Sequence, residues 1–178
     1  MFIEHQVALQ PYNTFGIAAR AQSLVRVRDA QDVRQALSSP LAQGPQFILG
    51  GGSNIVLTGD LKALVFKVES RGCRLVAEDD KSWLIEAEAG ENWHQFVQWT
   101  LQQGWPGLEN MALIPGTVGA APVQNIGAYG VELQDRFDSL DAIDLQTGQT
   151  FELRADQCAF GYRDSVFKHG PEIGRAHV

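Results

Sequence analysis

Three consecutive glycines follow a short apolar segment and limit the folds open to this chain. The segment 47–49 (Phe-Ile-Leu) is typical of a buried strand, and Gly50, Gly51, Gly52, Ser53 and Asn54 come directly after it. Because glycine has no Cβ, successive backbone N–H groups can converge on one anion, and the serine hydroxyl and asparagine amide add donors. A plain tight turn needs fewer glycines. The pattern therefore favours a pyrophosphate-binding loop at 50–54.

This loop does not match the common nucleotide-binding fingerprints. Ile55 stands where a Rossmann motif needs its third glycine, and the apolar residues 55–57 predict renewed extended structure where that motif needs a helix. The chain also has no Gly-Lys-Ser/Thr triplet for a nucleoside triphosphate. The remaining interpretation is a dinucleotide cofactor bound by a non-Rossmann fold, and FAD is the natural candidate for that cofactor.

Composition excludes several other classes of partner. The net charge is −7 over 178 residues, and no segment is rich in Lys or Arg, which argues against a nucleic-acid partner. The two cysteines and four histidines have no metal-ligand spacing, so no metal site is predicted. No apolar run approaches the roughly 18 residues of a membrane span. We therefore expect a cytoplasmic protein without a membrane partner.

The first part of the chain has a β-α-β pattern. Asp29 can cap a helix that Pro40 ends, and the alternation or run of apolar residues predicts strands at 23–27, 47–49 and 64–68. We expect residues 1–70 to form a first FAD-binding subdomain.

The following part predicts antiparallel structure around one helix. Hairpins are expected from 73–77 with 82–89 and from 140–145 with 150–153, and Asn92 can cap a helix. The expected inner face of that helix is Trp93, Phe96, Val97, Thr100 and Leu101. The prediction is an α+β fold whose second subdomain spans 71–171, with a cleft between the glycine-rich loops. Residues 172–178 resemble a translated sequencing adapter, and we interpret them as a non-native tail.

Two further segments suit a bound ligand. In the stretch 113–130, small residues at 116, 119, 120 and 121 let backbone approach a ring or phosphate, and Pro115 and Pro122 stiffen it. An apolar crossover buried under the sheet is the alternative. In the segment 160–165, Arg163 offers a planar cation for a carboxylate or phosphate, although a surface ion pair with Asp164 is the simpler interpretation.

Seven segments together, in the same order, closely resemble the UDP-N-acetylenolpyruvoylglucosamine reductase family over residues 10–169. They are Asn13-Thr14-Phe15-Gly16, Ile48-Leu49 with the loop 50–54, Ala89-Gly90-Glu91-Asn92-Trp93, Gly107-Leu108-Glu109-Asn110, Ile114-Pro115-Gly116-Thr117-Val118-Gly119, Gln124-Asn125-Ile126-Gly127-Ala128-Tyr129-Gly130, and Gly161-Tyr162-Arg163-Asp164-Ser165.

The resemblance implies a two-subdomain FAD-binding fold of the vanillyl-alcohol-oxidase type with noncovalent FAD. It implies that NADPH reduces the flavin, which then reduces UDP-N-acetylenolpyruvoylglucosamine to UDP-N-acetylmuramate for peptidoglycan synthesis. Arg163 matches a catalytic arginine that stabilises charge on the substrate carboxylate. The implied cofactor-binding residues are Asn13, Thr14, Gly50, Gly51, Gly52, Ser53, Asn54, Ile114, Pro115, Gly116, Gly119, Ala120, Ala121, Ile126 and Gly127.

The resemblance also implies that catalytic groups lie beyond this chain. The family's proton-donor serine and its partner glutamate belong to a C-terminal substrate domain that the matched residues do not include. Ser165 cannot replace that serine, because it belongs to the arginine motif. We therefore expect an inactive FAD-binding fragment. The alternatives are another FAD-dependent oxidoreductase of the same superfamily and a noncatalytic nucleotide-binding module.

Overall fold

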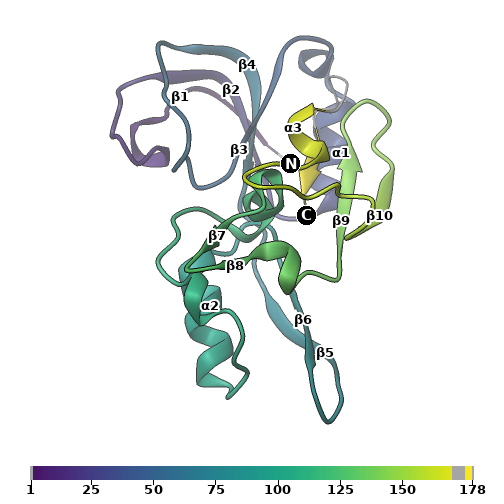
Figure 1. The fold of residues 1–178 in the computed structure, drawn as a ribbon. Coiled ribbons are helices and arrows are strands. Elements are labelled where there is room, and N and C mark those ends of the chain that lie inside the picture. Colours follow the sequence, from purple (N-terminus) through teal and green to yellow (C-terminus); the bar gives the residue numbers. More distant parts are fainter. Residues whose placement is uncertain (1, 170–174, 178) are drawn as a thin grey trace.

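The computed structural model describes residues 2–169 and 175–177, and its largest sheet is built from the first part of the chain (Figure 1). The four strands lie in the order β1-β2-β4-β3, where β1 is antiparallel to β2 and the other neighbours are parallel. Their bounds are Ile3–Ala8 (β1), Arg20–Val27 (β2), Gln46–Leu49 (β3) and Leu61–Val68 (β4). The three predicted strands of this part are confirmed.

Helix α1 (Ala30–Leu37) begins where the sequence predicted. The Asp29 carboxylate accepts a 2.9 Å hydrogen bond from the Asp32 N–H, which satisfies one of the free donors at the helix start. Val33 and Ala36 face inward and pack on β2 and β4. The helix therefore covers one face of the sheet.

The expected extended structure at 55–57 is absent. These residues lie in the irregular connection between β3 and β4, where Ile55 and Leu57 pack against the second face of the sheet and Val56 is exposed. The strand prediction was wrong: the segment pairs with no strand, and Ile55 and Leu57 pack as side chains in the cluster on that face.

The second part contains a projecting hairpin and a capped helix. The hairpin is β5 (Cys73–Glu78) with β6 (Trp83–Ala87), and it extends away from the rest of the molecule (Figure 1). Helix α2 (Trp93–Gln102) is capped by the Asn92 side chain, which accepts from the Gln95 N–H at 3.0 Å. Four of the five expected inner residues are buried, whereas Leu101, at the edge of that face, is exposed.

The second predicted hairpin is also confirmed, and it joins the first core. Strands β9 (Ser139–Asp144) and β10 (Thr150–Arg154) are antiparallel. Ile143 and Leu145 pack in one cluster with α1 and β4 residues. Short strands β7 (Gly127–Ala128) and β8 (Val131–Glu132), helix α3 (Val166–His169) and strand β11 (Arg175–His177), which pairs with β9, complete the fold. The subdomain boundary at residue 70 stays a prediction, as does the non-native origin of 172–178, of which 172–174 and 178 lie outside the described residues.

The glycine-rich stretch 113–130 is partly core. A 3₁₀ helix spans Val118–Gln124, and Ala121 and Ile126 are buried against α2 residues. The side chains of these two positions are therefore core residues, and their predicted role at the cofactor stays a prediction. Within the described ranges, no helix is long and apolar enough to cross a membrane, and no group of three His, Cys, Asp or Glu could hold a metal.

Candidate cofactor site

The two glycine-rich loops, more than sixty residues apart in the sequence, meet in space. A Cβ added to Gly51 would lie 3.2 Å from the Gly116 Cα, and one added to Gly50 would lie 2.9 Å from the Thr117 Oγ1. Gly116 has φ +123°, a conformation that side chains rarely adopt. The glycines are thus required for the loops to lie this close.

Both loops present backbone donors that no protein acceptor uses. Within the described residues, the N–H groups of 51–54 and of 116–117 donate to no acceptor, whereas those of 118–120 bond to Glu91, Ala89 and Thr117 carbonyl oxygens. Polar backbone groups in a fold are almost always satisfied, by protein, water or ligand. Six amides along two facing loops therefore fit an anionic diphosphate, the part of FAD that needs donors most.

Thr14 and Asn13 support the first loop in different ways. The Thr14 N–H and Oγ1 both donate to the Gly52 carbonyl oxygen, at 3.1 and 3.0 Å. The Asn13 side chain is buried and its amide bonds to the carbonyl oxygens of Leu9 and Ile17. Asn13 therefore fixes the turn that carries Thr14, and its side-chain amide is used within the protein.

Gly52 also lies against the backbone of the turn that precedes Thr14. Its φ is +64°, and an added Cβ would collide with the Tyr12 carbonyl oxygen. Across the site, the Asn54 amide donates to Gln124 Oε1 at 3.4 Å, which links the first loop to the second.

The other predicted residues of the second loop differ in burial. Ala121 and Ile126 are buried in the core, and Ile114 packs against the same cluster. A Cβ on Gly119 would approach the Ala89 Cβ to 2.6 Å, so this glycine permits close packing of the loop on its support. Pro115 and Ala120 are exposed on the loop.

The arginine motif docks on the end of the second loop. The Asn125 amide donates to the Gly161 carbonyl oxygen at 3.1 Å, and Arg163 Nη2 donates to the Gly127 carbonyl oxygen at the same distance. Arg163 is otherwise exposed. Its predicted alternative partner, Asp164, pairs instead with His169 at 2.7 Å, so the surface Arg163–Asp164 ion pair is not formed.

Unusual backbone conformations gather in these segments. Six described residues other than glycine have positive φ, and four of them, Leu113, Asn125, Tyr129 and Arg163, lie in the second loop or the arginine motif. Such residues cost roughly 1–3 kcal/mol each and concentrate at ligand sites.

Lys67 and Tyr12 are neighbours of the site that the sequence analysis did not single out. Lys67 Nζ donates to the Gly50 carbonyl oxygen at 2.9 Å and lies 5.8 Å from the centre of the Tyr12 ring. Burial lowers the pKa of this lysine, although the charge of Glu69 opposes the shift. A lysine inside the apolar strand 64–68 was the available signal.

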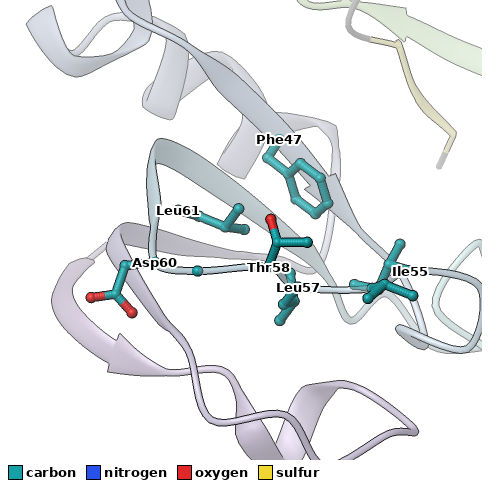
Figure 2. A pocket seen from close by; sticks show the side chains of 8 residues that line it. Phe47, Ile55, Leu57, Thr58, Asp60 and Leu61 are labelled. Carbon is teal, nitrogen blue, oxygen red and sulfur yellow. The ribbon is translucent and has the colours of Figure 1, made fainter.

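A separate hollow of about 360 Å³ lies beside the connection 55–61 (Figure 2). Phe47, Ile55, Leu57 and Leu61 supply most of its apolar wall, and Thr58 lies among them. None of the predicted cofactor residues lines it, so it is distinct from the site between the glycine loops.

Comparison with known proteins gives the class of this fold. A family model described as "FAD binding domain" matches residues 21–154. The chain belongs to this family of FAD-binding domains. The α+β FAD-binding fold predicted from the sequence is therefore confirmed.

More particularly, the chain is similar to UDP-N-acetylenolpyruvoylglucosamine reductases, as the motifs predicted. It is 62% identical to that of Azoarcus sp. (strain BH72), covering 90% of this chain and 48% of the relative, and 55% identical to that of Pseudomonas putida, covering 94% and 50%. The crystal structure of UDP-N-acetylenolpyruvylglucosamine reductase from Thermus caldophilus is 27% identical with a TM-score of 0.75, covering 99% of this chain and 60% of that one. The chain spans about half the length of the curated relatives it matches.

Proposed function

We propose that this chain is the FAD-binding portion of an NADPH-dependent enzyme that reduces UDP-N-acetylenolpyruvoylglucosamine to UDP-N-acetylmuramate in peptidoglycan synthesis. The observation that carries the cofactor assignment is the pair of facing glycine loops with six unused backbone N–H groups. The family supports FAD, and the names of the relatives support the substrate. A cytoplasmic location and the absence of a nucleic-acid partner stay part of the proposal.

In this proposal the two loops hold the cofactor's pyrophosphate. Residues 51–54 and 116–117 donate to its oxygens, and the Ser53 and Thr117 hydroxyls lie at the same junction. Oriented amides bind anions without bringing counter-charges that would need solvation of their own. FAD would accept a hydride from NADPH and deliver it to the enolpyruvyl ether.

Arg163 is the proposed catalytic residue of the chain. Its bond to the Gly127 carbonyl fixes the guanidinium beside the second loop while leaving further donors exposed. A fixed cation there can stabilise negative charge that develops on the substrate carboxylate during reduction.

The chain as given should bind FAD without turning substrate over. Ser165, the serine nearest to Arg163 in the sequence, is buried and donates to the Val123 carbonyl oxygen at 2.7 Å. It therefore anchors the motif and is not placed to protonate a substrate. In this proposal the proton donor and most groups that bind the nucleotide sugar belong to the portion of the enzyme that these residues do not cover.

The test is the absorption spectrum of the purified chain after incubation with FAD and gel filtration, followed by acid release and identification of the chromophore. We expect a flavin spectrum and released FAD, and an increase in melting temperature because FAD binds the folded state. Retention of FMN or riboflavin in preference to FAD would contradict the pyrophosphate assignment. Binding of ADP and NADPH with no binding of flavin would favour the noncatalytic nucleotide module.

In the full-length enzyme, NADPH could reduce FAD while the reduced FAD fails to reduce the enolpyruvyl substrate. That result would favour a different oxidoreductase of the superfamily.

A further inference from the structure

A lysine lies directly behind the first glycine loop. Lys67, on β4, has a half-buried side chain whose Nζ donates to the carbonyl oxygens of Gly50 at 2.9 Å and Val68 at 3.2 Å. Gly50 is the first residue of the loop, so this ammonium touches the peptide that opens the proposed pyrophosphate site.

The bond to Gly50 sets the direction of the next amide. In a trans peptide the C=O and the following N–H point in opposite directions. Because the Gly50 oxygen is held by Lys67, the Gly51 N–H is directed away from the ammonium, and Gly51 is the residue that approaches Gly116. An ammonium on the oxygen also polarises the same peptide and strengthens its N–H as a donor.

The charge of Lys67 is not neutralised at contact distance. The neighbouring cation, Arg26, pairs with Glu4 and Glu69, at 2.7 Å each. Among the described residues no carboxylate comes within ion-pairing distance of Lys67, and its hydrogen-bond acceptors are both backbone oxygens. Even a partly buried charge without a counter-ion loses solvation, and a ligand of opposite charge would compensate that loss.

The Tyr12 ring lies beside both this cation and Arg26. The Lys67 Nζ and the Arg26 Cζ lie 5.8 and 5.7 Å from the ring centre, a distance at which an aromatic ring attracts cations. The carbonyl of the same tyrosine lies against Gly52. Lys67, the Tyr12 residue and the glycine loop are therefore in mutual contact.

We propose that Lys67 is a positioning residue of the pyrophosphate site, which fixes the Gly50–Gly51 peptide and supplies positive charge behind the diphosphate. This inference rests on the proposed FAD site and adds a residue that acts through the loop without touching the cofactor. A dianionic ligand would provide the counter-charge that the lysine lacks within the chain.

The experiment titrates FAD into the 178-residue chain and into Lys67→Met, Lys67→Gln and Lys67→Arg variants at several salt concentrations. Lys62→Met is the matched control, since Lys62 lies on the same strand and is exposed. We expect Lys67→Met to bind FAD on the order of tenfold more weakly than the parent, as for the loss of a charged hydrogen bond. Lys67→Arg should keep most of the parent's affinity for FAD. Lys62→Met should bind FAD as tightly as the parent.

The salt dependence separates charge from structure. Removing one cation near a dianion should flatten the dependence of the FAD dissociation constant on salt in Lys67→Met and Lys67→Gln, an effect that a purely structural defect would not produce. Lys67→Gln keeps a hydrogen-bond donor for the Gly50 oxygen. It is the variant to measure if Lys67→Met does not fold.

Parent-like affinity and salt dependence in the folded Met or Gln variant would overturn the role of Lys67 and leave the FAD site standing. Failure of the parent chain and Lys62→Met to bind FAD would instead overturn the proposed function, and the role of Lys67 with it.

Discussion

Thr14 holds Gly52 through two hydrogen bonds to one oxygen: its Oγ1 and its backbone N–H lie 3.0 and 3.1 Å from the Gly52 carbonyl oxygen. This pair joins the N-terminal turn to the proposed pyrophosphate loop across 38 residues of sequence. The shape of the loop therefore depends on a residue outside it.

Replacing Thr14 by Val should weaken FAD binding only a few-fold. The variant keeps the side-chain shape and the backbone bond and loses the hydroxyl bond, which is worth about 0.5–1.5 kcal/mol. Flavin titration and thermal unfolding would measure the change. Thr58→Val is the control, because Thr58 is exposed in the connection before β4. A loss of a hundredfold or more would mean that the hydroxyl contacts the cofactor itself.

Gly51→Val should obstruct the site between the two loops. The added Cβ begins 3.2 Å from the Gly116 Cα, and overpacking of this kind costs about 1–3 kcal/mol, which corresponds to roughly five- to 150-fold in FAD affinity. Gly59→Val provides a control, since a Cβ at Gly59 meets nothing within 4 Å. Unchanged flavin content in the Gly51 variant, measured by absorbance after gel filtration, would show that the cofactor lies elsewhere.

In a full-length enzyme, Arg163→Ala should separate the two half-reactions. Reduction of FAD by NADPH should stay within a few-fold, whereas oxidation of the flavin by the enolpyruvyl substrate should slow by about 10²–10³, because the cation acts only when carboxylate charge develops. Stopped-flow absorbance follows each step. Lys168→Ala, which loses its contact to the Arg163 carbonyl oxygen, controls for disturbance of the turn. Equal slowing of both steps in Arg163→Ala would assign the residue to flavin binding or folding.

The 178-residue chain should show no measurable formation of UDP-N-acetylmuramate. Correct positioning of reactants is worth about 7–11 kcal/mol of a reaction barrier, and most groups that would position the nucleotide sugar are assigned to the other half of the enzyme. The assay supplies NADPH, FAD and UDP-N-acetylenolpyruvoylglucosamine without oxygen and detects product by mass spectrometry, beside a full-length relative. Product at a comparable rate would place the whole catalytic set within these residues.

The thiol of Cys158 should make stability depend on alkaline pH. Burial raises the pKa of Cys158 from 9.0 to about 11, with a smaller contribution from Asp156. The folded state therefore keeps the thiol proton to a higher pH than the unfolded state. The resulting contribution to the free energy of unfolding is complete below pH 9 and is lost as pH rises to about 11. Urea unfolding at pH 8 and pH 10.5 should show a larger loss in the parent than in Cys158→Ala. Equal losses would mean that the thiol is not protected in the folded state.

Local signals in the sequence were sufficient for the elements that involve near neighbours. The caps at Asp29 and Asn92 each bond to an N–H three residues later, so the sequence alone contains both partners. The two hairpins were predictable for the same reason, since each joins strands close in sequence. The glycine loop at 50–54 was predicted to be a ligand site because three glycines exceed what a turn requires, and that role stays a prediction.

Tertiary structure decided everything that depended on distant partners. The segment 55–57 has a strand-like composition, but its apolar side chains Ile55 and Leu57 are buried against distant residues of one cluster and its backbone pairs with no strand. Ala121 and Ile126, whose roles at the cofactor stay a prediction, have side chains packed in one cluster with α2 residues, which the sequence did not indicate. The contact of Lys67 with the Gly50 carbonyl joins residues that sequence spacing does not relate. The sequence by itself determined which backbone segments can bend and cap, because those preferences are local. Only the folded chain decided which loops meet, because that depends on which apolar faces are buried against one another.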